Sequence, residues 1–154
     1  MRADLYILDQ KTLKARVRFH NNTQQTEYLY LPRVFPGGVS LNNFFQFEPR
    51  ESVSYVGPLV KRKPFGEDDI ITVLPAEVYI SDEVDLKSLY RINSRSNLRV
   101  RYLAFHPLDG LGKGDHMVET PWEDLHVPSF ESMYEALGKT PWTSRRLRKP
   151  ALEI

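Results

Sequence analysis

The chain has 154 residues, which is enough for one domain with its own hydrophobic core. Lysine and arginine number 21 against 20 acidic residues, so the formal net charge of +1 excludes a global electrostatic attraction to nucleic acid or to an anionic membrane. The sequence has no cysteine, which excludes disulfides, thiolate catalysis and thiolate metal ligands.

The first residues lack the features of a signal peptide, because Asp4 and Asp9 interrupt their short apolar run. Elsewhere no run of about 18 apolar residues is present to span a bilayer. With Met1 as the natural start of the chain, these features predict a cytoplasmic protein with no membrane partner.

Short β-strands dominate the predicted secondary structure. Residues 13–19 alternate strictly between apolar and cationic side chains, which is typical of a strand with one buried face, and residues 98–105 repeat this alternation. Residues 28–31 predict a return strand that forms a hairpin with 13–19. Further strands, most of them bounded by Pro or Gly, are predicted at 44–48, 53–56, 70–74, 78–86 (with a bulge near Ser81) and 98–105. Seven short strands separated by turn signals predict an all-β fold, an antiparallel β-sandwich over residues 1–106.

The last third of the chain has a different character. Glycines at 110, 112 and 114 predict a flexible connection, and 120–125 predict the start of a short helix. Residues 129–138 carry apolar residues at helical spacing between a Ser N-cap and a Gly C-cap, which predicts a second short helix. We therefore expect residues 107–154 to form a helical or irregular appendage packed on the sandwich, not a second domain.

The middle of the chain carries an unusual ordered motif. It reads Tyr55-Val-Gly57-Pro58-Leu-Val60-Lys61-Arg62, followed by Glu67-Asp68, Pro75, Val84-Asp85-Leu86 and Tyr90. Over about residues 11–105, this pattern resembles the immunoglobulin-like N-terminal domain of deuterolysin-type zinc metalloendopeptidases, which also occurs alone in small bacterial proteins. The resemblance implies an immunoglobulin-like sandwich that acts as a folding assistant or inhibitor.

The sequence departs from that family at two places. The family's Thr-Pro-Leu-x-Gly turn is replaced by Val34-Phe35-Pro36-Gly37-Gly38, which keeps only the proline and a glycine. The chain also has no His-Glu-x-x-His motif, so it lacks both the histidines that bind zinc in the peptidase and the glutamate that acts as its general base. The resemblance therefore implies the accessory domain without its enzyme.

Four residues are the predicted contacts with a partner. Lys61 and Arg62 could meet an acidic partner surface, although pairing with acidic residues 67–69 of the same loop is the simpler interpretation. Tyr55 belongs to the motif around Gly57, where Gly and Pro set a close turn. Phe44 is the fourth, because a regular strand through Phe44 and Phe45 would turn one aromatic side chain outward.

No pattern for catalysis, metal or cofactor binding is present. The only soft metal ligands, His20, His106, His116 and His126, show no metal-binding spacing, and no Gly-x-Ser-x-Gly elbow organises a nucleophile. Tyr90 is predicted to be a packing residue with a buried ring and a hydroxyl bonded to backbone. We expect no catalytic residues, no cofactor and no metal. An enzyme of unfamiliar type is kept as an alternative hypothesis.

The leading hypothesis is a non-enzymatic bacterial binding protein of the inhibitor, immunity or chaperone type, whose partner is a toxin or hydrolase. The alternative is a structural or assembly protein that self-associates through a sheet edge or through the appendage. A third hypothesis, binding of RNA or DNA, rests on the basic segment 144–149 and on the arginine faces at Arg16, Arg18, Arg99 and Arg101.

Overall fold

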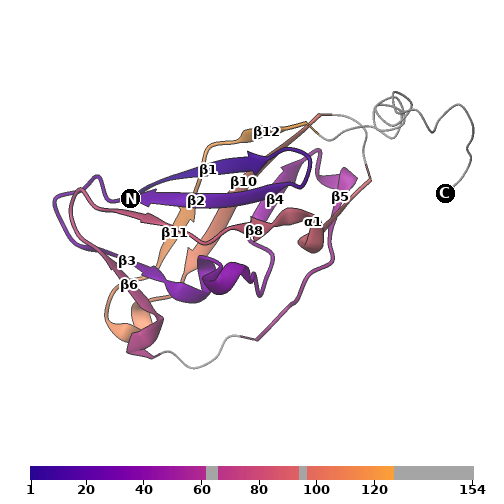
Figure 1. Cartoon of the computed structure of the whole chain (residues 1–154). Helices are drawn as coiled ribbons and strands as arrows, with labels where there is room; N and C mark the ends of the chain where they lie inside the picture. Colours follow the sequence, from indigo (N-terminus) through magenta and orange to yellow (C-terminus); the bar gives the residue numbers. More distant parts are fainter. Residues whose placement is uncertain (62–65, 94–96, 127–154) are drawn as a thin grey trace, which may run out of the picture.

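The computed structural model describes residues 1–61, 66–93 and 97–126. Strands dominate it, and every strand pair is antiparallel, which confirms the predicted all-β fold (Figure 1). One four-stranded sheet has the order β1-β2-β7, and β8 also pairs with β2. Its strands are β1 (Arg2–Asp9), β2 (Lys14–His20), β7 (Val78–Ile80) and β8 (Val84–Asp85).

A second four-stranded sheet is built around the longest strand, β10. It pairs with β4 on one side and with β11 and β12 on the other. The four strands are β10 (Leu98–His106), β4 (Phe45–Glu48), β11 (His116–Glu119) and β12 (Glu123–Leu125). The remaining described strands form two two-stranded ribbons. One pairs β3 (Glu27–Tyr30) with β6 (Ile70–Val73), and the other pairs β5 (Val53–Tyr55) with β9 (Tyr90–Ile92).

Helical structure in the described residues is limited to single turns. The one α-helical turn, α1, spans Leu86–Leu89, and Asp85 caps it by accepting a hydrogen bond from the Lys87 backbone N–H. The 3-10 turns are Leu31–Arg33, Pro36–Gly38, Arg50–Ser52, Glu67–Asp69 and Asp109–Leu111. No helix in the described part of the chain is long and apolar enough to cross a membrane.

The two sheets share one hydrophobic core. The alternation predicted for β2 and β10 is confirmed, because alternate side chains such as Phe19 and Tyr102 are fully buried. These two rings meet edge to face across the sheets, with centroids 5.7 Å apart. Phe35 stacks on Phe45 at 5.4 Å and also contacts Tyr102. Such aromatic pairs contribute roughly 0.5–1.5 kcal/mol each beyond their buried area.

Phe35 reaches this core from a strained backbone. Its φ of 58° is left-handed, a conformation that costs a non-glycine residue roughly 1–2 kcal/mol. Its ring is completely buried, and burial of a phenylalanine contributes about 1.5–3 kcal/mol, so the packing offsets the strain. The immunoglobulin-like strand arrangement itself stays a prediction.

The predicted hairpin between 13–19 and 28–31 is wrong. Strand β2 pairs with β1 through a tight turn, and β3 pairs with β6 instead. Asp9 sets the turn, because its side chain accepts from the Lys11 N–H at 2.8 Å and its carbonyl accepts from the Leu13 N–H at 2.8 Å. The apolar-rich segment 2–9 is therefore a strand, and it pairs with β2 in place of the more distant segment 28–31.

Residues 78–86 and 120–125 also differ from prediction. The first segment is split into β7, β8 and the start of α1, because Ser81 leaves the strand path to bond Val17 through both its N–H and its Oγ. The second is not helical but forms β12, so the second sheet continues past residue 106. The predicted helix at 129–138 lies outside the described residues.

Candidate functional site

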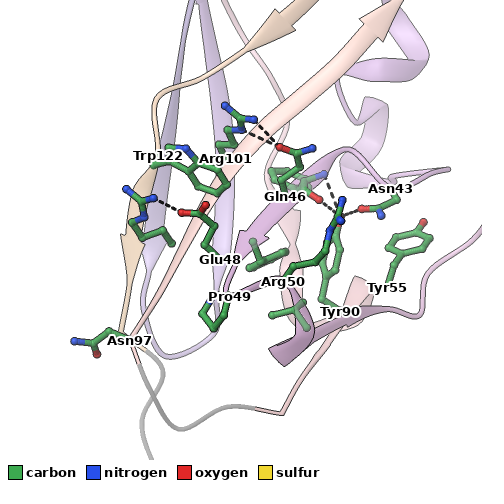
Figure 2. A pocket seen from close by; sticks show the side chains of 14 residues that line it. Asn43, Gln46, Glu48, Pro49, Arg50, Tyr55, Tyr90, Asn97, Arg101 and Trp122 are labelled. Atoms are coloured by element: carbon green, nitrogen blue, oxygen red, sulfur yellow. Dashed lines mark hydrogen bonds and ion pairs between the residues drawn. The ribbon is translucent and has the colours of Figure 1, made fainter.

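An open groove of about 820 Å³ lies among the described residues. It runs along the free edge of β4, between the outward face of β10 and the β5–β9 ribbon (Figure 2). Figure 2 shows Trp122 and Arg101 at one end and Tyr55 at the other. The lining residues are Asn43, Phe45, Gln46, Phe47, Glu48, Pro49, Arg50, Val53, Tyr55, Tyr90, Asn97, Arg99, Arg101 and Trp122.

Two arginines of β10 form one wall of the groove. Strand alternation turns Arg99 and Arg101 outward, and the register places Glu48 and Gln46 of β4 directly opposite them. Arg99 forms an ion pair with Glu48, and Arg101 donates from Nε and Nη2 to Gln46 Oε1 at 2.9 and 2.8 Å. These cross-strand contacts fix both guanidinium groups in place.

Trp122 covers the two guanidinium groups. The Arg99 and Arg101 Cζ atoms lie 5.0 and 4.6 Å from the centroid of its ring. Cation–π contacts of this kind contribute roughly 0.5–1 kcal/mol at exposed sites. An aromatic ring and two arginines therefore form one ordered unit at the rim of the groove.

A bulge between β11 and β12 places Trp122 there. β10 pairs Leu103 with Glu119 but Val100 with Glu123, so the register shifts by one residue between the two strands. Thr120 fills the shift: its N–H donates to the Tyr102 carbonyl, and its Oγ1 accepts from the Tyr102 N–H, both at 3.0 Å. The extra residue lets the chain lift Trp122 onto the arginine wall.

Tyr90 anchors the opposite wall. Its ring is buried and contacts Phe47 and Tyr55, with centroids 4.7 and 5.3 Å away. Its hydroxyl accepts the Phe45 N–H at 3.1 Å and donates to the Asn43 side chain, and burial raises the pKa of the Tyr90 hydroxyl. The prediction of a buried ring with a backbone-bonded hydroxyl is confirmed. Burial also raises the pKa of Tyr55, whose hydroxyl donates to the Pro58 carbonyl.

The free edge of β4 offers few backbone groups. The Leu103 N–H donates to the Phe44 carbonyl, so in this register residues 46 and 48 also bond to β10, while 45 and 47 face the groove. Tyr90 occupies the Phe45 N–H, and Pro49 has no N–H to offer. Phe47 is left as the position whose N–H and C=O are oriented into the groove.

Arg50 gives the groove its charge. The lining has three guanidinium groups, from Arg50, Arg99 and Arg101, against the single carboxylate of Glu48, an excess of two positive charges. Glu119, outside the lining, pairs with Arg101 at 3.1 Å. Arg50 is exposed and forms no ion pair with any residue in the described ranges. It is therefore the cation available to a ligand.

The structure does not bring the four predicted contact residues together. Tyr55 lines the groove, whereas Lys61 lines a separate small cavity of about 170 Å³ together with Asp69. Arg62 lies outside the described residues. The expectation of an exposed Phe44 is wrong, because both Phe44 and Phe45 are buried. The strand begins only at Phe45, so alternation does not apply to Phe44, and Arg33 covers its ring with Cζ 4.9 Å from the centroid.

Arg50 and Trp122 were not among the predicted contacts. The arginines of β10 were visible in the sequence but were assigned to the nucleic-acid hypothesis, and residues 120–125 were expected to begin a helix. The signal available in the sequence for this contact was a tryptophan that follows a proline shortly after a strand with alternating arginines. The position of Arg50 in the groove depends on the turn after Pro49 and left no signal.

Two of the four histidines meet in the structure, but both are engaged. His106 and His116 are cross-strand partners with ring centroids 5.4 Å apart. His106 Nδ1 accepts from the Tyr30 N–H at 2.9 Å, and His116 Nε2 lies 2.7 Å from the Tyr28 carbonyl, to which it donates. Within the described ranges no three metal-ligating side chains cluster.

The arginine faces that suggested nucleic-acid binding are mostly neutralised. Glu83 lies 3.9 Å from Lys14 and 3.7 Å from Arg16 on the first sheet. On the second sheet, Arg99 pairs with Glu48 and Arg101 with Glu119. A phosphate backbone needs free cations in series, so this pairing counts against that hypothesis for these faces.

No model of a known protein family matches the chain, and no curated protein matches it significantly. The resemblance of residues 11–105 to the N-terminal domain of deuterolysin-type peptidases therefore stays a prediction based on its motif.

Proposed function

We propose that the protein is a non-enzymatic binding module for another protein, of the inhibitor, immunity or chaperone type, with a toxin or hydrolase as its partner. Trp122, held over Arg99 and Arg101 at the rim of an open groove, is the observation that carries this proposal. Tryptophan, tyrosine and arginine dominate the energetically important residues of protein interfaces.

The pre-ordering of these side chains favours binding. Gln46, Glu48 and Glu119 already hold the arginines, so a partner does not have to immobilise them. Ordering a long side chain at an interface costs about 0.5–1.5 kcal/mol, and a fixed contact surface avoids most of that cost.

Affinity capture followed by titration tests the proposal. The full chain is used as bait in an extract of its native host, the recovered protein is identified and purified, and the two are titrated directly. Trp122→Ala is expected to weaken binding about 30-fold, as for a hot spot worth about 2 kcal/mol. Met117→Ala is the matched control, because Met117 is 57% exposed on β11 and lies outside the groove. Recovery of no specific partner, or equal affinities for both variants, contradicts the proposal.

Self-association is the second candidate and has its own observation. Val78 and Ile80 are 39% and 53% exposed on β7, which is the last strand of its sheet. An exposed apolar edge strand is a template for pairing with another copy. Sedimentation over a range of concentrations separates the candidates, since a concentration-independent monomer rules out self-assembly.

A further inference from the structure

Two unpaired recognition groups lie in the same groove. Arg50 is its one cation without an acidic partner in the described part of the chain, and Phe47 presents a backbone N–H and C=O on the free edge of β4. A guanidinium group matches the planar fork of a carboxylate. An edge N–H and C=O match the backbone of an extended peptide.

We infer that the groove binds an extended, carboxylate-bearing segment of the partner protein, with Arg50 recognising the carboxylate and Phe47 forming a β-bridge to the backbone. This deepens the proposed function and rests on it. The charge of Arg50, which no acidic residue in the described part of the chain offsets, complements an acidic segment.

The geometry limits the bridge to one residue of the partner. On one side of Phe47, the Tyr90 hydroxyl already takes the Phe45 N–H, and on the other side Pro49 has no N–H. A long strand from a second copy of the protein therefore cannot form a continuous backbone ladder with β4. A short segment that crosses the edge at Phe47 and continues toward Arg50 fits these constraints.

The same contacts disfavour a nucleic acid in the groove. Base stacking needs an accessible ring face, but Phe47 and Tyr90 are only 7% and 4% exposed. Arg99 and Arg101 are already opposed by Glu48 and Glu119, which leaves one free cation where a phosphate backbone needs several.

The experiment uses the ¹⁵N-labelled full chain and two degenerate pentapeptide pools, one with a fixed central glutamate and one with a fixed central glutamine. The glutamate pool is expected to shift the Phe47 amide and the Arg50 Nε–H resonances and to bind about tenfold more tightly than the glutamine pool. Arg50→Gln is expected to abolish that difference. Arg91→Gln, an exposed arginine on β9 outside the groove, should preserve it.

Three results would overturn the inference: equal affinity of the two pools, preserved discrimination in Arg50→Gln, or tighter binding of an oligothymidylate at the same resonances. Its failure is distinct from that of the proposed function. A partner captured through Trp122 but indifferent to Arg50→Gln removes the inference alone. Discrimination between the pools without any captured partner removes the proposed function alone.

Discussion

His106 and Tyr102 lie on the same buried face of β10, with the imidazole Nε2 3.1 Å from the tyrosine hydroxyl. The Tyr30 N–H donates to His106 Nδ1, so the neutral ring carries its proton on Nε2 and donates it to Tyr102. The Tyr102 hydroxyl in turn donates to the Arg33 carbonyl at 2.7 Å. Each imidazole nitrogen in this series of hydrogen bonds has a fixed role as donor or acceptor. A second proton, on Nδ1 of the imidazole, would face the Tyr30 N–H.

We predict that His106 makes the fold sensitive to acid. Burial, with His116 and Arg33 nearby, lowers the pKa of His106 from 6.5 to about 3. Only the unfolded chain binds a proton between these values, so stability is full above about pH 6.5 and falls toward pH 3, by about 1.4 kcal/mol per pH unit. In His106→Asn, which keeps an acceptor and does not titrate, urea unfolding across this range should show a shallower pH slope. His126→Asn, at an exposed position, should keep the wild-type slope.

Thr120→Val should destabilise the bulge that carries Trp122. Valine matches the shape of threonine but leaves the buried Tyr102 N–H without an acceptor, which costs about 1–3 kcal/mol. In a Trp142→Phe background, the emission of Trp122 should shift as its contact with the arginines loosens. Thr120→Ser keeps the acceptor and should behave as wild type; a loss in Thr120→Ser as large as that in Thr120→Val would contradict this account.

Tyr90→Phe should weaken the fold and open the edge of β4. The Phe45 N–H and the Asn43 side chain lose their common partner, with an expected loss of about 1–3 kcal/mol. Thermal unfolding measures the loss, and hydrogen exchange of the Phe45 amide should accelerate. Tyr6→Phe is the control, since Tyr6 is 45% exposed on β1 and should change stability little. An unchanged Phe45 exchange rate would contradict this account.

Asn21→Ala is expected to be among the most costly polar substitutions. Asn21 is fully buried, and its Nδ2 donates to the Gln25 and Val73 carbonyls at 2.7 and 2.9 Å while Oδ1 accepts the Thr23 N–H. Several buried groups lose their partners at once, so we expect a loss of about 3 kcal/mol or more in chemical denaturation. The neighbouring Asn22 is exposed, and Asn22→Ala should cost less than about 0.5 kcal/mol.

Local sequence patterns predicted most of the strands but not their partners. The pattern in 13–19 and 98–105 reports only which face is buried, and this is why β2 and β10 could be placed from sequence. Pairing depends on the turns, and the turn built by Asp9 between β1 and β2 was not recognised because Asp4 and Asp9 masked the strand character of 2–9.

The candidate site was harder to predict because long-range contacts assemble it. Tyr55 was identified from its motif, yet the residues that accompany it come from β4, β10 and the bulge before β12. Gly57 also has a different role from the expected turn: a Cβ there would lie 2.7 Å from the Leu89 side chain and 2.8 Å from the Tyr55 hydroxyl. Close packing, which no local pattern encodes, favours glycine at this position.

Two imidazoles occupy the side of β3 where another strand could have continued the sheet. His106 takes the Tyr30 N–H and His116 donates to the Tyr28 carbonyl, whereas the other edge of β3 pairs with β6. The β3–β6 ribbon is thus fastened to β10 and β11 by two imidazole contacts in place of a strand ladder, and one of these imidazoles is the acid-sensitive His106. On acidification, the amides of this ribbon should lose protection against hydrogen exchange before those of the two four-stranded sheets, so that the protein passes through a state with one ribbon detached.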